Sequence, residues 1–372
     1  MERKKLIIIS LIIIFLVVGV MGYYQFTGNV VKEDTIKIGW MGPLTGQSSV
    51  LGIDGITAAE IAVDEINAKG GINGKKIELI VEDDSYDNKK SLDAYNKLVN
   101  IDKVDIILVY TYSAMYSLAN KAKEDNVILF DPLDCNDEIA GLNNNTFCLS
   151  TDSEGIAKVL SNYANENHYE KMGILYYDSD LFMPLIKKYY ENEYDGEIIS
   201  EKYSVGTSDF RTPLLKMINQ NVSGIVLLGY DEDGIAMKQA RDLGFKGKFF
   251  MTGTVTSPGL IQASQGTSEG TIFAFFSAPK TQEPTKTFTE KFVKLKGREP
   301  YLDLACYPTY DSIYTLAKAL NKTEDIEELK KEILNVNFIG VTGEIKFSPN
   351  HAMKIPEKIF VLRDGKPEKL ED

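Results

Sequence analysis

A serine motif in the C-terminal half of the chain has the residue types of a nucleophilic site. Residues 266–270 read Gly-Thr-Ser-Glu-Gly and match the G-x-S-x-G pattern of serine hydrolases, with Ser268 as the nucleophile. That pattern requires a strand before the serine and a helix after it. Here polar residues 262–265 precede the motif and a β-type run, 271–276, follows it. We therefore expect a chance match and no enzyme, and a serine hydrolase is the alternative.

A second group of residues with side chains suited to ligand binding follows three predicted strands. These residues carry hydroxyl, carboxyl and aromatic groups. They are Tyr112 with Ser113 after residues 105–109, Phe182 after residues 172–177, and Tyr230 with Asp231 after residues 224–228. Ser113 opens a predicted helix, whose first N–H groups attract a carboxylate. Asp231 is placed to cap the helix that follows it. An aromatic cleft with a few fixed polar groups is typical of a small-molecule site.

Strands and helices alternate along the part of the chain that must position these residues. The predicted strands are 35–41, 76–81, 105–109, 127–130, 172–177, 197–203, 224–228 and 248–251, and the predicted helices are 52–69, 88–99, 113–124, 155–165, 183–192, 210–219 and 231–243. Such alternation indicates parallel sheets covered by helices on both faces. The pattern restarts near residue 155, which predicts two α/β halves with ligand loops at the carboxyl ends of the strands.

The last third of the chain is mixed in its predicted structure. Helices are expected at 286–296, 303–320 and 326–334, and strands at 343–347 and 358–362. Nothing local assigns these segments to either half. Two acidic clusters, 82–84 and 231–233, lack the spacing of a calcium loop and are interpreted as solvated surface and helix starts. No metal or cofactor is expected, since nucleotide-binding and zincin motifs are absent from the sequence.

Composition places the 372-residue chain among globular proteins of about two domains. Its 41 Lys and Arg against 54 Asp and Glu give a net charge of −13. An acidic body repels phosphate backbones, so nucleic acid is not an expected partner.

The first segment is the sharpest change in composition. Three cationic residues, 3–5, precede an apolar run from Leu6 to Gly22 that only Ser10 interrupts. The run has 17 residues, the lower limit for a membrane span and slightly more than the apolar core of a usual signal peptide. Cationic residues stay on the cytoplasmic side, so both interpretations export the rest. We expect an uncleaved anchor or signal at 1–24 and a linker at 25–34, hence a membrane-anchored extracytoplasmic body. Secretion after cleavage is the alternative.

Cys135 and Cys148 lie 13 positions apart across a loop rich in Gly and Asn. In an oxidising compartment a disulfide is able to close this spacing, and two buried thiols are the alternative. Cys306 is left as a free buried thiol. Export also makes the sequons at Asn144, Asn221 and Asn321 potential glycan acceptors.

Several blocks resemble the branched-chain amino acid (leucine/isoleucine/valine) solute-binding proteins of ABC importers. The most specific is residues 64–76, Asp-Glu-Ile-Asn-Ala-Lys-Gly-Gly-Ile-Asn-Gly-Lys-Lys, and the others are residues 42–46 with Gly52, 82–84 with Asp87, 239–244, 310–311 and 343–347. They occur in the order of the family and cover about residues 35–365.

The resemblance implies a type I periplasmic-binding fold, in which two lobes joined by three crossing strands hold a ligand between them. It assigns residues 35–150 with 281–338 to lobe 1 and residues 152–279 with 340–372 to lobe 2, each a doubly wound parallel sheet flanked by helices. The implied function is delivery of a small ligand, a branched-chain or related amino acid or amide, to the membrane subunits of an ABC permease. A ligand-sensing subunit for a membrane signalling partner is the alternative.

The resemblance also implies individual site residues. The carboxylate-binding serine falls in the Tyr112-Ser113 turn, and backbone contacts to the ligand fall near Asp134 and Cys135. Aromatic contacts from lobe 2 fall at Phe182 and Tyr230.

Two features depart from the family. The glutamate that holds the α-ammonium group is replaced near Thr254, which carries no charge. Asp134 or Asp231 is then a substitute, or the ligand is not an α-amino acid. The disulfide that the family has in lobe 1 is missing, because Ser85 and Thr111 occupy the corresponding positions.

Overall fold

The computed structural model describes residues 35–46 and 48–370. The expected anchor at 1–24 and the linker at 25–34 lie outside these residues. No helix in the described part is long and apolar enough to cross a membrane.

The first sheet has six strands in the order β13-β5-β4-β3-β1-β2, and every neighbouring pair is parallel. Its strands are β1 (Ile36–Gly42), β2 (Ile77–Asp83), β3 (Ile106–Val109), β4 (Ile128–Asp131), β5 (Thr146–Ser150) and β13 (Ala352–Lys354). The helices between these strands are α2 (Ser49–Ala68), α3 (Asn88–Asn96), α4 (Tyr112–Glu124) and α5 (Asp137–Ala140). A π-helical turn, Lys97–Ile101, continues α3.

The second sheet has seven strands in the order β15-β14-β10-β9-β8-β6-β7. Its strands are β6 (Lys171–Tyr177), β7 (Glu197–Tyr203), β8 (Gly224–Leu228), β9 (Lys248–Met251), β10 (Ile272–Phe275), β14 (Lys358–Arg363) and β15 (Lys366–Lys369). Its helices are α6 (Ser153–Glu166), α7 (Phe182–Glu193), α8 (Arg211–Ile218), α9 (Asp233–Asp242) and α10 (Pro258–Ser264), with a 3₁₀ turn at Gly253–Thr256.

Two strands at one edge of the second sheet differ from the expected parallel arrangement. Strand β14 is antiparallel to β10, and β15 is antiparallel to β14. Only two residues connect β14 and β15. This hairpin permits no parallel crossover, which needs about a dozen residues or more.

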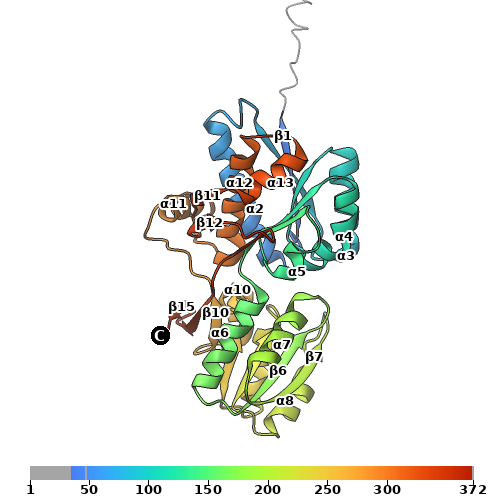
Figure 1. Cartoon of the computed structure of the whole chain (residues 1–372). Helices are drawn as coiled ribbons and strands as arrows, with labels where there is room; N and C mark the ends of the chain where they lie inside the picture. The colour runs from blue at the N-terminus through green and yellow to red at the C-terminus, as the bar shows by residue number, and fades with distance from the viewer. Residues whose placement is uncertain (1–34, 47, 371–372) are drawn as a thin grey trace, which may run out of the picture. The chain divides into compact units, whose positions relative to one another are not determined.

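The last third of the chain returns to the first half. Helices α11 (Thr285–Lys296), α12 (Asp303–Leu320) and α13 (Ile326–Leu334) precede a small hairpin of β11 (Asn337–Ile339) and β12 (Glu344–Lys346). Helices α11 and α12 pack against α2, and Figure 1 shows α2, α12 and α13 in the same half of the molecule.

Strand β13 corrects one expected boundary. Because β13 hydrogen-bonds to β5, residues 352–354 belong to the first sheet, and the expectation that 340–372 lies in the second lobe is wrong for them. The other lobe boundaries stay a prediction. The chain passes from one sheet to the other after β5, after β10 and after β13.

The block at residues 64–76 has a clear structural role, since it joins the end of α2 to β2. The Asn67 side chain donates to the Ile77 carbonyl oxygen at 2.8 Å and accepts from the Ile77 N–H at 2.7 Å. Gly71 has φ +77°, and a Cβ there would lie 1.9 Å from the Lys75 carbonyl oxygen. Glycine is therefore required at this turn.

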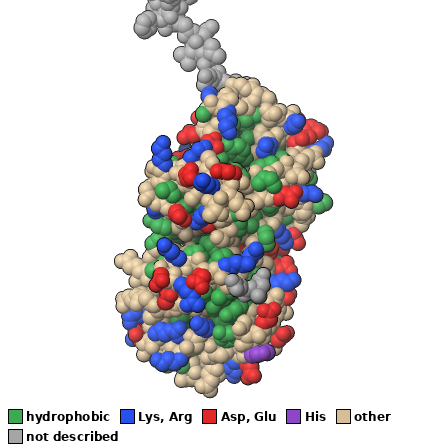
Figure 2. Space-filling model, turned by 90° about the vertical axis from the view of Figure 1, so that its left-hand side faces the viewer, with side chains coloured by type: hydrophobic (Ala, Val, Ile, Leu, Met, Phe, Trp, Pro, Cys, Tyr) green, Lys and Arg blue, Asp and Glu red, His purple; other side chains and the backbone are tan. Residues whose placement is uncertain are grey.

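Side chains of both charges cover the surface. Figure 2 shows Lys and Arg interspersed with Asp and Glu on the face drawn there. A mixed surface of this kind is typical of a solvated body.

Candidate functional site

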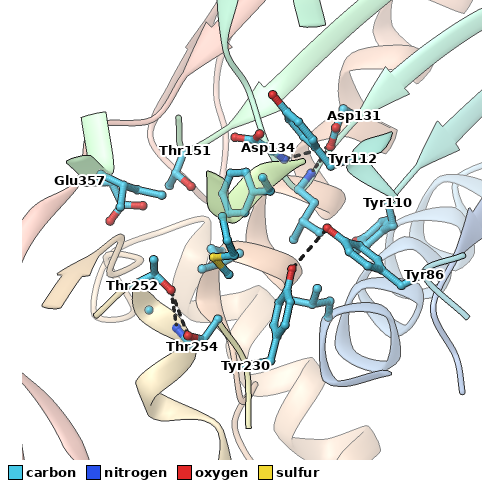
Figure 3. Close-up of a pocket in the computed structure, with 17 residues that line it drawn as sticks. Tyr86, Tyr110, Tyr112, Asp131, Asp134, Thr151, Tyr230, Thr252, Thr254 and Glu357 are labelled. Atoms are coloured by element: carbon cyan, nitrogen blue, oxygen red, sulfur yellow. Dashed lines mark hydrogen bonds between the residues drawn. The ribbon is translucent and has the colours of Figure 1, made fainter. Parts of the chain in front are cut away.

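A cavity lies between loops of the two sheets. Its apolar and aromatic walls are Leu51, Tyr86, Tyr110, Tyr112, Leu133, Ile156, Phe182, Met183, Tyr230, Gly253 and Leu304. Its polar lining is Asp131, Asp134, Thr151, Thr252, Thr254 and Glu357 (Figure 3). This composition matches a site for a small organic molecule.

Both halves of the molecule contribute to the lining because the carboxyl ends of their strands meet there. Asp131 ends β4 of the first sheet, and Tyr230 follows β8 of the second. Thr151 lies in the crossing after β5, and Glu357 lies in the crossing after β13. The crossing segments therefore supply polar groups to the cavity.

Of the residues expected at the site, the structure brings five together. They are Tyr112, Asp134, Phe182, Tyr230 and Thr254. Ser113, Cys135 and Asp231 are not among the lining residues. Ser113 is half-buried in the first turn of α4.

Cys135 is buried next to Asp134 and forms a disulfide with Cys148 of β5, with the two Cα atoms 5.0 Å apart. The Cys135 N–H also donates to the Thr151 carbonyl oxygen at 2.8 Å. These bonds fix the loop that carries Asp134 against the first sheet. Cys306 is free and buried.

The Asp231 carboxyl bonds to Ser257, and the expectation that it caps the next helix is wrong. Its Oδ1 accepts from the Ser257 hydroxyl at 2.5 Å, which ties it to the start of α10. Helix α9 begins two residues later and has no side-chain cap.

Aromatic pairs connect the two walls of the cavity. Tyr86 follows β2 and pairs with Tyr230, with ring centroids 6.1 Å apart and hydroxyl oxygens 3.5 Å apart. Figure 3 shows these two hydroxyl groups pointing toward one another. Tyr112 of α4 and Phe182 of α7 form the second pair, at 5.5 Å. Each pair joins a residue next to the first sheet to one next to the second.

Three carboxyl groups of the lining are buried and lack complete hydrogen bonding. Asp131, Asp134 and Glu357 are 1%, 3% and 9% exposed. Asp131 Oδ2, both oxygens of Asp134 and Glu357 Oε2 have no partner. Burial raises the pKa of Asp131 to about 7 and that of Glu357 to about 8. Burial, and then the neighbouring Asp131, hold the pKa of Asp134 well above its usual range.

Sequence reasoning missed several lining residues. Asp131, Tyr86 and Thr252 follow or end strands that the sequence predicts, so the strand-end rule applied to every strand would have found them. Glu357 and Leu304 lie in the last third of the chain, and no local pattern marks them.

The acidic clusters are less solvated than expected. Asp84 is fully buried and accepts from the hydroxyls of Thr111 and Ser91 at 2.6 and 2.8 Å. Asp233 is also fully buried and accepts from the Tyr203 hydroxyl at 2.8 Å. Both contribute to packing behind the cavity walls.

The serine motif lies in the reverse of the strand-then-helix context that a nucleophile elbow requires. Ser268 follows helix α10 and precedes strand β10, and it is buried outside the cavity lining. Its Oγ lies 2.8 Å from the Ser264 Oγ. In residues 35–46 and 48–370 no cluster of three or more His, Cys, Asp or Glu side chains is arranged to hold a metal ion.

Two α/β units with a buried, aromatic cavity between their strand ends define a ligand-binding fold. Residues 35–365 match the family described as periplasmic binding protein. The chain belongs to this family of solute-binding proteins.

Curated relatives cover nearly the whole chain. A leucine-, isoleucine-, valine-, threonine- and alanine-binding protein of Pseudomonas aeruginosa is 24% identical, over 92% of each chain. Leu/Ile/Val-binding protein homolog 2 of Brucella abortus is 27% identical, over 89% of this chain and 91% of its own.

Solved structures show the same fold. The branched-chain amino acid transporter substrate-binding protein LivJ of Streptococcus pneumoniae, in complex with isoleucine, is 27% identical, with a TM-score of 0.81 over 90% of this chain and 98% of its own. The leucine-binding protein LivK of Thermotoga maritima is 21% identical, with a TM-score of 0.84 over 91% of this chain and 98% of its own.

Proposed function

We propose that the protein captures an amino acid or a related amide outside the cytoplasm and delivers it to an ABC permease. The observation that carries this proposal is the buried cavity to which both halves contribute. The relatives named above bind branched-chain amino acids and give the ligand class. Ser268, the nucleophile that a serine hydrolase would need, lies outside the cavity lining between α10 and β10, which favours a carrier over the hydrolase.

Closure of the two halves is the proposed working step. The pairs Tyr86–Tyr230 and Tyr112–Phe182 form only when the strand ends of the two sheets approach. A ligand between them contacts both walls only in the closed state, so it shifts the population toward closure. The permease would then distinguish loaded from empty protein by the relative position of the halves.

Asp134 is the proposed substitute for the missing glutamate. It lines the cavity with both carboxyl oxygens unpartnered, whereas Asp231 is bonded to Ser257. Thr254 also lines the cavity, but its hydroxyl donates to the Gly229 carbonyl oxygen at 3.1 Å. The N-terminal segment, residues 1–24, is proposed to anchor the protein in the membrane.

Calorimetry and thermal melting of the full chain with a panel of amino acids and amides test this function. We expect one chemical series to bind with a rise in melting temperature, and the bound ligand to be recovered unchanged. Absence of binding across the panel, or conversion of a panel member, would contradict it. A permease encoded beside the gene, with ATPase activity stimulated by the loaded protein, distinguishes transport from signalling.

A further inference from the structure

The lining of the cavity contains carboxyl oxygens that have no hydrogen-bond donor. Four carboxyl oxygens in its lining have no partner, and both oxygens of Asp134 are among them. Among the described residues, Asp134 is the one side chain with two such carboxyl oxygens. Asp131 uses Oδ1 to accept from the N–H groups of Leu133 and Asp134 at 2.8 and 2.9 Å, which leaves Oδ2 unpartnered.

Three tyrosine hydroxyl groups of the lining, those of Tyr230, Tyr110 and Tyr112, are bonded within the protein. Tyr230 donates to Asp180 Oδ2 at 2.9 Å, and the Tyr110 hydroxyl bonds to the Ala305 carbonyl oxygen at 3.0 Å. The Tyr112 hydroxyl lies 2.8 Å from that of Tyr116. A ligand carboxylate would therefore have to compete with these partners for the three tyrosine donors.

Positive charge is absent from the described lining residues, which include no Lys, Arg or His. Lys354 acts on Asp134 from outside the cavity, but its Nζ is 3.1 Å from Asp137 Oδ1. Asp152 adds further negative charge beside Asp134 and Glu357. An occupant with an ammonium group would supply the missing charge and the missing donors together.

We infer that the site takes a small organic cation, a primary ammonium on a compact apolar body without a free carboxylate, as in the amide of a branched-chain amino acid. Asp134 is the primary partner of the ammonium, and Asp131 and Glu357 add acceptors and negative charge. The rings of Tyr86, Tyr112 and Phe182 cover the apolar body and favour a cation at their faces. This inference rests on the proposed function, because it names the ligand class of the same cavity.

Binding of a cation should release protons. The raised pKa values of Asp131 and Glu357, about 7 and 8, mean that the empty cavity holds protons near neutral pH. A cation favours the ionised carboxyls and displaces these protons, so its affinity rises with pH. The other ionisable groups that act on the three carboxyls are Asp152, Lys354, Tyr86, Tyr110, Tyr112 and Tyr116. An anion held by protonated carboxyls would show the opposite slope.

Three probes that share a branched body test the inference on the full chain: 3-methylbutylamine, leucine and 4-methylpentanoate. We expect the amine to bind at least about tenfold tighter than leucine, since it needs no carboxylate partner. Its affinity should rise up to about tenfold per pH unit between pH 5 and 8, with protons released in calorimetry. Leucine binding tighter than the amine, or 4-methylpentanoate binding best with affinity that falls with pH, overturns the inference. Either result leaves the proposed function standing, whereas no binding by these probes or the wider panel contradicts that function.

Two variants of matched chemistry assign the role of Asp134. Asp134→Asn removes the charge at similar volume, and we expect it to weaken amine binding by about thirtyfold or more. Asp231→Asn is the control, since this carboxyl is bonded to Ser257 outside the lining, and amine affinity should be unchanged. Glu357→Gln provides a second cavity variant if Asp134→Asn lowers the melting temperature, and a threefold or greater loss is expected. Equal losses in Asp134→Asn and Asp231→Asn, or no loss in either cavity variant, would overturn the assignment.

Discussion

Buried carboxyl groups occur in two regions of the molecule, and the regions differ in the hydrogen-bond donors that these groups receive. Beside α12, Asp54 accepts from both Nη atoms of Arg298 at 2.6 and 3.0 Å and from the Tyr301 N–H at 2.6 Å. Asp311 accepts from the Val341 and Thr342 N–H groups and from the Thr342 hydroxyl at 2.6–2.8 Å. In the cavity, Asp134 has no such partner.

The comparison shows which acids stabilise the fold and which do not. A buried carboxyl with donors on both oxygens recovers part of the cost of its desolvation, although burial still raises the pKa of Asp311 to about 6. A buried carboxyl without donors destabilises the ligand-free protein, and it favours ligand binding only if the ligand supplies the donors. The four predictions below test this difference, in order of expected effect.

Removal of the Asp54 side chain should have the largest effect. Asp54→Ala leaves the Arg298 guanidinium and the Tyr301 N–H without their acceptor, so we expect a loss of about 3 kcal/mol in the free energy of unfolding. Urea denaturation of the full chain measures it. Arg298→Ala should give a loss of similar sign, and a neutral result for Asp54→Ala would remove the distinction between the two regions.

Asp311→Asn should be the next most damaging substitution. An amide NH₂ would face one of the N–H donors that now bond to a carboxyl oxygen, so we expect a loss of about 2 kcal/mol by urea denaturation. Asp231→Asn is a control on one carboxyl with a single hydroxyl partner and should lose less. An equal or smaller loss at Asp311 would show that the number of donors does not determine stability.

Most of the fold was predictable from the sequence, but which buried acids have hydrogen-bond donors was not. Strands β1 to β4 and β6 to β9 were predictable because their apolar runs end at turn residues. The short strands β5 and β13 were missed, since pairing between distant segments, such as Ala352 with Cys148, creates them. Periodicity carries no information about such pairs.

The candidate site, like the fold, was predictable only in part. The strand-end rule predicted Tyr112, Phe182 and Tyr230, and the family resemblance pointed to Asp134 and Thr254. Glu357 enters the cavity through the crossing after β13, which depends on how both sheets pack. Whether a buried acid has donors is also a property of the packed structure, so Asp311 and Asp134 looked alike in the sequence.

The cavity acid Asp131 should give an effect of opposite sign that depends on pH. Its pKa of about 7 in the folded protein lies above its value in the unfolded chain, about 3.9. The folded state therefore binds more protons between pH 4 and 7, and the stability from this group is complete below pH 4 and lost as pH rises to 7. Asp131→Asn keeps an oxygen for the Leu133 and Asp134 N–H groups and removes the charge.

We expect Asp131→Asn to match the parent protein near pH 4 and to exceed it in stability by on the order of 2 kcal/mol at pH 8, without ligand. Urea titrations at the two pH values provide the measurement. Asp311→Asn is the control: burial raises the pKa of Asp311 to about 6 as well, but both of its oxygens have donors, so the variant should be destabilising at both pH values, with the smaller loss at pH 8. A variant that is less stable than the parent at pH 8 would show that the Asp131 charge is stabilised in the folded state.

The smallest effect is expected at Tyr230, which connects the cavity wall to a further buried acid, Asp180. Its hydroxyl donates to Asp180 Oδ2, and burial raises the pKa of Asp180 to about 6. Tyr230→Phe keeps the ring that packs near Tyr86 and removes this donor, so we expect a loss of about 1 kcal/mol in unfolding free energy. The loss should be larger at pH 8 than at pH 5, because a hydrogen bond to an ionised carboxyl is stronger than one to its protonated form. Tyr86→Phe is the matched control, since that hydroxyl meets another hydroxyl at 3.5 Å, and its loss should not change with pH. If both variants showed the same pH dependence, the hydroxyl of Tyr230 would not stabilise ionised Asp180, and the donor count at this wall would have to be revised.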